Sequence, residues 1–355
     1  MTPARWVPSK GTLVYDSVSH LEYSGVQRID IAQLQPTDRL IEDRFSLSHE
    51  NGVLVCGVYD GHGGSETADY ISKELPGRIT TALQNEENTQ LHSQRLIDEC
   101  LKLDREIHET FAKTFRFLRS VPFREQILST LLSQPRALLT AQRAKAGSTA
   151  LLARISSGHF ELMNVGDCRA VITSRDNNSE QNIRTEQLTN DQNPHHPEEV
   201  QRLRAEHPGE EDTVIMQNRV LGRIGTTRSF GDVYYKEKDT WFALGVMGHP
   251  KLTPKHGLSW RHQSEVLFGY YKSPPYLTAT PEVRTFSVSP GSILVMATDG
   301  LWSLVDNEWV AENIWIGVEK EEQNIALYLL KRLEEERKYP GDDTTMIVLR
   351  LQNKV

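Results

Sequence analysis

Cysteine is scarce in this sequence, and the spacing of the few cysteines excludes several classes of protein. The 355 residues include only Cys56, Cys100 and Cys168, and no two of them form a CxxC motif. A disulfide framework and a structural zinc site are therefore not expected. A reducing, intracellular compartment fits this cysteine usage best.

Long apolar runs and clusters of basic residues are also missing. No apolar stretch approaches the roughly 20 residues that a membrane span needs, and the opening MTPARWVPSK lacks the apolar core of a secretory signal. Arg5 and Lys10 precede the first acidic residue, Asp16, which leaves a weak mitochondrial presequence open. The net charge of -8 argues against nucleic acid or an anionic membrane as the main partner.

Repeats, low-complexity tracts and Pro/Ser-rich linkers are absent as well. We therefore expect one domain over residues 25–353, preceded by an N-terminal extension of residues 1–24. Residues 234–276 mix Gly, Pro, His, Lys and aromatic residues without a clear period. Their length exceeds that of a compact connection, so they predict a flap-like surface insertion near the substrate.

Apolar runs of strand length recur along this domain. GVLVCGVYD, STALLARI, HFELMNVGD, RAVITS, GSILVMATD and TTMIVLRL are almost continuously apolar, as strands buried on both faces are. Helical stripes cover 68–79, 100–118 and 325–333, although Pro76 is expected to bend or break the first. PEEVQRLRAEHPG predicts a short helix. Because strands and helices segregate, we predict an α+β fold, a four-layer αββα sandwich of two stacked, mainly antiparallel sheets with helices outside.

Acidic residues recur where the predicted strands begin or end. They are Glu42, Asp43, Asp60, Asp167, Asp299, Asp342 and Asp343. Each aspartate taken alone is most simply a turn residue or a helix cap. Carboxylates gathered at one sheet edge, however, repel each other and raise each other's pKa unless cations neutralise them. Oxygen ligands of this kind suit hard divalent ions such as Mg²⁺ or Mn²⁺.

The stretch VYDGHGG indicates what reaction such ions could support. Two ions about 3.5 to 4 Å apart can share one carboxylate and one water, which makes hydroxide available near neutral pH. Asp60 is placed to be the shared carboxylate, and Gly61 has no side chain to keep its carbonyl from an ion. His62 is placed to protonate a leaving oxygen.

These motifs resemble those of a known family. VYDGHGG, AGSTALL, NVGDCRA, TRSFGD, ATDGLW and GDDTT occur in the order and spacing of the metal-dependent type 2C serine/threonine protein phosphatases. The resemblance implies hydrolysis of phosphoserine and phosphothreonine by a binuclear Mg²⁺ or Mn²⁺ centre with a metal-activated water.

The same resemblance implies a role for each matching residue. Asp60 would bridge both ions and His62 would be the general acid. Gly61 would bind one ion through its carbonyl, and Asp299 and Asp342 would hold the other. The remaining positions are Asp167 for a weaker third ion, and Glu42 and Asp43, which would act through metal-bound waters. Asp232 of TRSFGD is expected to anchor a turn, and Asp343 to support the loop around Asp342.

Three further segments resemble one branch of the family more narrowly. LTNDQNPHHPEEVQRLRAEHP, RVLGRIGTTRSFGDV and SPPYLTATPEV look like the catalytic subunit of pyruvate dehydrogenase phosphatase. This branch implies pyruvate dehydrogenase E1 as the phosphoprotein partner. It also implies the mitochondrial matrix as the compartment, with the cytosol as the alternative because the presequence is weak.

The sequence departs from the family at the phosphate-binding arginine. The position four residues before Glu42 is Asp38, and Arg39 comes one place later. Either Arg39 binds the phosphate, or the ions and another donor hold it. A catalytically silent scaffold or regulator is the alternative function, and a small phosphoester or phosphohistidine is the alternative substrate. The sequence leaves open the oligomeric state, the resident metal, a regulatory subunit and any calcium dependence.

Overall fold

The computed structural model describes residues 25–36, 40–83, 89–122, 124–156, 158–176, 179–238, 246, 249, 251–252, 271–336, 338 and 340–352. The expected N-terminal extension and the candidate phosphate ligand Arg39 lie outside the described residues. So does most of the expected insertion at 234–276.

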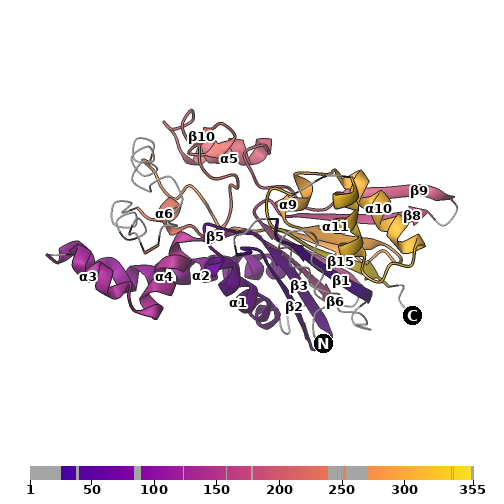
Figure 1. Cartoon of the computed structure of the whole chain (residues 1–355), viewed down its shortest axis with the longest axis horizontal. Helices are drawn as coiled ribbons and strands as arrows, with labels where there is room; N and C mark the ends of the chain where they lie inside the picture. Colours follow the sequence, from indigo (N-terminus) through magenta and orange to yellow (C-terminus); the bar gives the residue numbers. More distant parts are fainter. Residues whose placement is uncertain are drawn as a thin grey trace.

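Two five-stranded antiparallel sheets form the centre of the molecule (Figure 1). The first has the strand order β1 (Val26–Leu34), β15 (Thr344–Leu351), β14 (Ile293–Ala297), β8 (Arg169–Asp176) and β9 (Ser179–Gln187). The second has the order β13 (Glu282–Ser287), β7 (His159–Val165), β6 (Ala150–Ser156), β3 (Val53–Tyr59) and β2 (Arg44–Glu50). Buried side chains of both sheets, such as Leu54 and Met296, belong to one apolar cluster between them.

Helices cover the two outer faces. α1 (Glu66–Ala82) and α2 (Thr89–Phe115) pack on the sheet that contains β3. α10 (Asn307–Glu319) and α11 (Ile325–Glu335) pack on the other sheet. Successive residues of β3 explain the layering, because Leu54 faces the opposite sheet whereas Val55 faces the helices. The predicted αββα sandwich is therefore confirmed.

Short elements connect these layers. They are β4 (Gly61–His62), η1 (Arg116–Ser120), α3 (Arg124–Leu131), α4 (Pro135–Lys145), β5 (Gly147–Ser148), α5 (Pro197–Glu206), β10 (Ile215–Met216), β11 (Arg219–Val220), β12 (Phe230–Gly231), α6 (Val233–Lys236) and α9 (Asp299–Trp302). Strands β12, β5 and β4 form a small sheet of their own. This sheet brings together three segments that lie far apart in the sequence.

Prolines act differently in two helices. The short helix predicted from PEEVQRLRAEHPG is confirmed, and α5 begins at Pro197 as expected. Pro76, in contrast, does not break α1, which continues to Ala82. Leu75, Pro76 and Ile79 are all buried in α1, and burial of this apolar face offsets the single backbone hydrogen bond that proline removes.

Among the described residues, no helix combines the length and the apolar character required to cross a membrane.

Candidate metal centre

Acidic side chains from five segments of the chain meet at one end of the two sheets. Asp60 directly follows β3, and Asp299 opens α9 directly after β14. Their carboxyl groups are within hydrogen-bonding distance of each other. Two carboxyl groups take up such an arrangement when a proton or a cation neutralises part of their charge.

The carboxylates of this cluster raise each other's pKa values. Burial, followed by the charges of Asp299, Asp43 and Asp167, raises the pKa of Asp60 well above its ordinary value. Burial and the charge of Asp299 also raise the pKa of Asp167. For Asp43, burial again raises the pKa, although hydrogen bonds from two threonine hydroxyls oppose it. Because these carboxylates raise each other's pKa, bound cations would stabilise the cluster.

The segment that carries Glu42 and Asp43 is held from both sides. On one side, Asp343 accepts a hydrogen bond from the Glu42 amide at 2.6 Å. On the other, the Arg44 guanidinium donates to the Asp43 carbonyl at 2.7 Å and to the Asp69 carboxylate of α1 at 2.6 Å. Thr298, the residue before α9, donates to the Asp43 carboxylate at 2.9 Å. The charged side chains of Asp343 and Arg44 therefore hold the backbone of this segment, and the Thr298 hydroxyl orients the Asp43 carboxylate.

Position 61 has to be a glycine because its backbone lies close to that of Glu42. A Cβ atom at Gly61 would lie 2.3 Å from the backbone oxygen of Glu42, so any side chain would push the two segments apart. The sequence alone explains this glycine by the approach of an ion to its carbonyl. The structure adds a second reason, which is the packing of the Glu42 segment against the residue that follows Asp60.

The two other predicted metal ligands lie on turns. Asp342 is exposed in the turn before β15, where its carboxylate accepts a hydrogen bond from the Asp343 amide at 2.9 Å. Asp167 lies between β7 and β8. The turn that carries it is held by Gln192, whose side-chain oxygen accepts from the Gly166 amide at 2.7 Å.

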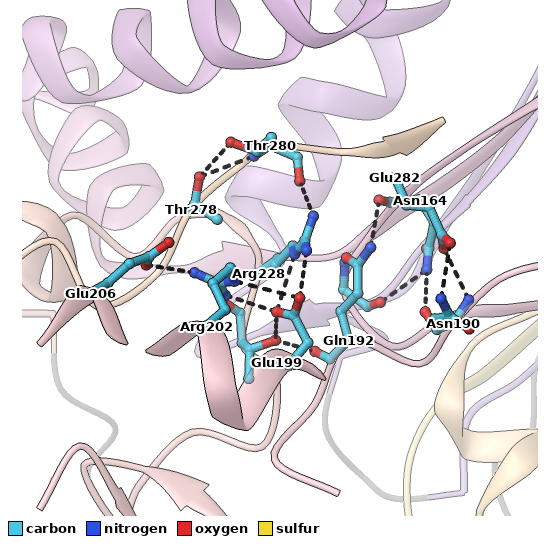
Figure 2. A network of polar contacts seen from close by, with 12 residues as sticks. Asn164, Asn190, Gln192, Glu199, Arg202, Glu206, Arg228, Thr278, Thr280 and Glu282 are labelled. Carbon is cyan, nitrogen blue, oxygen red and sulfur yellow. Dashed lines mark hydrogen bonds and ion pairs between the residues drawn. The ribbon is translucent and has the colours of Figure 1, made fainter. Parts of the chain in front are cut away.

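A polar network continues from Gln192 to α5 (Figure 2). The Gln192 side chain donates to the backbone oxygen of Asn164 at 3.2 Å. Glu199 of α5 lies between Arg202 and Arg228 and forms an ion pair with each. Burial raises the pKa of Glu199, but hydrogen bonds from Arg228, Arg202 and Thr227 outweigh it and lower the pKa to about 2. This network fixes α5 against the segment that leads from Arg228 to Asp232.

The sequence reading did not assign Asp191 and Arg169 to the site. The charge of Asp191 raises the pKa values of both Asp167 and Asp299, so it lies close to the cluster. Arg169 donates to Asp191 through Nε at 3.0 Å and stacks over the Trp302 ring at 4.9 Å. Asp191 lies in a loop, not at a predicted strand end, so the strand-end criterion could not find it.

His62 lies at the edge of the same cluster, on β4. Burial opposes its protonation, but the carboxylates of Asp232, Asp167 and Glu42 outweigh burial and raise the pKa of the imidazole. The Asp232 carboxylate is 2.7 Å from Nε2 of His62. Asp232 was expected to anchor a turn, and the sequence offered no local signal for this contact.

These residues fit divalent cations. Within the described ranges, no group of three or more acidic, histidine or cysteine side chains is arranged so that it could hold a metal ion by itself. A complete shell is not required, because Mg²⁺ keeps several waters and takes one or two carboxylates directly. The mutual repulsion of Asp60, Asp299, Asp43 and Asp167 and their oxygen-only chemistry are what hard divalent ions satisfy.

Comparison with known proteins shows which proteins this chain resembles. The chain is 32% identical over 316 residues to mitochondrial pyruvate dehydrogenase (acetyl-transferring) phosphatase 1 of Saccharomyces cerevisiae, over 81% of the chain and 50% of the relative. It is 28% identical over 361 residues to mitochondrial phosphatase 2 of the same name from Homo sapiens, over 85% of the chain and 65% of the relative. The chain thus spans about half to two thirds of the length of these curated relatives.

Solved structures share the fold at lower sequence identity. Serine-threonine phosphatase 2C from Toxoplasma gondii superposes with a TM-score of 0.60 at 17% identity, covering 98% of this chain and 100% of that chain. A C. elegans sex determining protein superposes with a TM-score of 0.58 at 18% identity, covering 94% and 66% of the two chains. The family model "Protein phosphatase 2C" matches residues 27–333. The chain therefore belongs to the protein phosphatase 2C family.

Proposed function

We propose that this chain is a Mg²⁺- or Mn²⁺-dependent phosphatase that hydrolyses phosphoserine and phosphothreonine in proteins. The observation that carries the proposal is the cluster of mutually repelling carboxylates around Asp60, with the His62 imidazole at its edge. Membership of the protein phosphatase 2C family supports it.

The acidic residues divide into direct and indirect metal ligands in this proposal. Asp60, the Gly61 carbonyl, Asp299 and Asp342 would hold the two ions directly, with Asp60 as the ligand common to both. Asp167 would hold a third ion, and Glu42 and Asp43 would act through metal-bound waters. When bound, the ions supply positive charge to the phosphoryl oxygens and an activated water.

His62 provides the acid that this reaction requires. An alkoxide is a poor leaving group, so the serine or threonine oxygen has to receive a proton as its bond to phosphorus breaks. His62 is partly exposed, and its raised pKa keeps the imidazole protonated closer to neutral pH than burial alone would allow. Arg39 remains the proposed phosphate ligand, and Arg39→Lys should raise KM because a lysine cannot bind the phosphate in a bidentate way.

Pyruvate dehydrogenase E1 is the substrate we propose, with the mitochondrial matrix as the compartment. The names of two curated relatives support both assignments. We further propose that residues 25–353 form a single catalytic domain and that residues 234–276 form its substrate-facing insertion. Tyr276, the last residue of that segment, is buried and donates to Glu210 at 2.6 Å, so the C-terminal end of the segment is anchored.

The test is release of phosphate from a phosphoserine peptide of pyruvate dehydrogenase, with Mg²⁺, Mn²⁺ or chelator, beside an unrelated phosphopeptide and a small aryl phosphate. Metal-dependent release with preference for the first peptide is the expected result. Equal rates on both peptides would remove the substrate assignment and keep the phosphatase. If neither Mg²⁺ nor Mn²⁺ supports phosphate release, the catalytically silent scaffold would be favoured.

A further inference from the structure

His62 and Asp232 are 170 positions apart in the sequence, yet their side chains meet beside the metal centre. Nε2 of His62 lies 2.7 Å from Oδ2 of Asp232. The Ser229 hydroxyl donates to the same oxygen, also at 2.7 Å. The Asp232 side chain is fully buried, whereas 32% of the His62 side chain is exposed. Because an ionised carboxylate is only an acceptor, the hydrogen of this bond belongs to Nε2 of His62.

The backbone around the pair allows this contact. β5 lies between β4 and β12, so Gly147 pairs with His62 on one side and with Gly231 on the other. A Cβ atom at Gly147 would lie 2.1 Å from both Nε2 of His62 and Oδ2 of Asp232. Any residue other than glycine would therefore disrupt the hydrogen bond.

Asp232 has features that a turn residue does not need. Its backbone is left-handed, with φ of 49° and ψ of 40°, a conformation that is uncommon outside glycine and recurs at functional sites. Its side chain does not cap α6. Its second oxygen, Oδ1, is buried without a hydrogen-bond partner in the part of the chain that the structure describes. A turn-forming aspartate would instead bind nearby backbone amides.

Helix α2 anchors the segment that carries Asp232. Asp104 of α2 accepts from the Gly231 amide at 2.8 Å and from the Lys236 ammonium at 2.8 Å. Lys236 also donates to the Ser229 carbonyl at 2.7 Å. These contacts fix the backbone on both sides of Asp232, which limits the movement of its carboxylate.

We propose that Asp232 is a positioning residue for His62, which keeps a hydrogen on Nε2 and turns Nδ1 towards the leaving oxygen. This inference rests on the proposed phosphatase function. The Nδ1 proton passes to the seryl oxygen, which keeps the electron pair of the breaking P–O bond. The imidazole is then neutral, with its hydrogen on Nε2. A carboxylate that orients a catalytic imidazole through its other nitrogen is a recurrent arrangement.

Asp232→Asn tests the proposal because asparagine keeps the shape and tolerates the left-handed backbone. Its amide can donate to Nε2, which would hold the imidazole in the wrong tautomer. We expect kcat on a phosphoserine peptide to fall about 10²-fold or more. On p-nitrophenyl phosphate, whose leaving anion needs no proton, the loss should be roughly threefold or less. Equal losses on the two substrates would overturn the proposal.

A double-mutant cycle separates positioning from stability. If Asp232 acts through His62, Asp232→Asn should not lower kcat any further in a protein that already carries His62→Gln. Independent, multiplicative losses would contradict the proposal. Asp30→Asn is a matched control, since Asp30 is also fully buried and accepts from Arg28 at 2.6 Å, but it lies on β1 and contacts the Ile325 amide at the start of α11. It should lower the melting temperature and leave the dependence on leaving group unchanged; the same substrate pattern in this control would overturn the proposal.

Nitrogen-15 NMR of the metal-free chain gives a readout that requires no turnover. The neutral His62 ring should carry its hydrogen on Nε2 in the wild type and on Nδ1 in Asp232→Asn. The same tautomer in both proteins would contradict the inference. If the wild type shows no metal-dependent phosphate release, the proposed function fails, while the NMR result still decides whether Asp232 sets the tautomer.

Discussion

Two buried carboxylates, those of Asp60 and Glu199, have pKa values that are shifted in opposite directions. Around Asp60, burial and neighbouring carboxylates both raise the pKa. Around Glu199, burial also raises the pKa, but hydrogen bonds from Arg228, Arg202 and Thr227 prevail and lower it to about 2. Figure 2 shows how Arg202 and Arg228 enclose Glu199.

The difference distinguishes a structural carboxylate from a binding one. The chain supplies its own cations to Glu199, so this group contributes to stability without any ligand. The chain surrounds Asp60 mainly with like charges, so the ionised carboxylate destabilises the fold until a cation binds. Removing the charge of Asp60 should therefore stabilise the metal-free protein, whereas removing a partner of Glu199 should destabilise it.

The largest expected effect is on turnover. Asp60→Asn should lower Mn²⁺-dependent kcat by roughly 10³-fold or more, because it removes the carboxylate that we propose as the ligand common to both ions. Phosphate release from a phosphoserine peptide over a range of Mn²⁺ concentrations measures the loss. Retention of wild-type turnover at saturating Mn²⁺ would show that Asp60 is not the bridging ligand.

The next effect is on stability at the structural carboxylate. Arg228→Met should lower the free energy of unfolding by about 3 kcal/mol, because Glu199 stays buried with one of its two arginine partners gone. Urea unfolding followed by circular dichroism provides the value. Arg204→Met on the same helix is the control, since Arg204 is exposed, and should change the free energy by less than about 0.5 kcal/mol. Equal effects of the two substitutions would mean that the ion pair is not what holds α5.

Acid should affect the same group in a defined pH window. The pKa of Glu199 is lowered from 4.5 to about 2, so its stabilising contribution is present above about pH 4.5 and is lost as the pH falls towards 2. The loss is at most about 3 kcal/mol. Unfolding free energies at several pH values should fall more steeply over this window in the wild type than in Glu199→Gln. Parallel curves would rule out this linkage.

The smallest effect has the opposite sign. In the metal-free protein, Asp60→Asn removes one of several like charges, so we expect the free energy of unfolding to rise by about 1 kcal/mol. Thermal unfolding in chelator measures this change, with Asp98→Asn on the exposed face of α2 as the control. A clear fall in the melting temperature of Asp60→Asn alone would mean that the carboxylate already has a stabilising partner within the chain.

The sequence predicted the inner strands better than the outer ones. Its six apolar runs correspond to β3, β6, β7, β8, β14 and β15, which are the central strands of the two sheets. The four edge strands, β1, β2, β9 and β13, were not identified as strands. An edge strand has one neighbour and alternates or interrupts its apolar residues, as Arg28 and Asp30 do in β1. Continuous hydrophobicity therefore detects burial on both faces but does not detect edges.

The same limit applies to the candidate site. Asp60 and Asp299 could be predicted to meet, because each follows a central strand of one of the two stacked sheets. The contact between His62 and Asp232 could not be predicted, because it depends on the register of three two-residue strands, β4, β5 and β12. Such short pairings leave no periodic signal in the sequence.

The central claim is that the carboxylates around Asp60 bind divalent ions, whereas Glu199, which is paired with Arg202 and Arg228, does not need them. Calorimetric titration of the metal-free wild-type chain with Mn²⁺, beside Asp60→Asn and Glu199→Gln, tests it most directly. We predict binding of at least two ions to the wild type and to Glu199→Gln, with loss of the shared site in Asp60→Asn. Wild-type binding in Asp60→Asn, or its absence in all three proteins at millimolar Mn²⁺, would contradict the account.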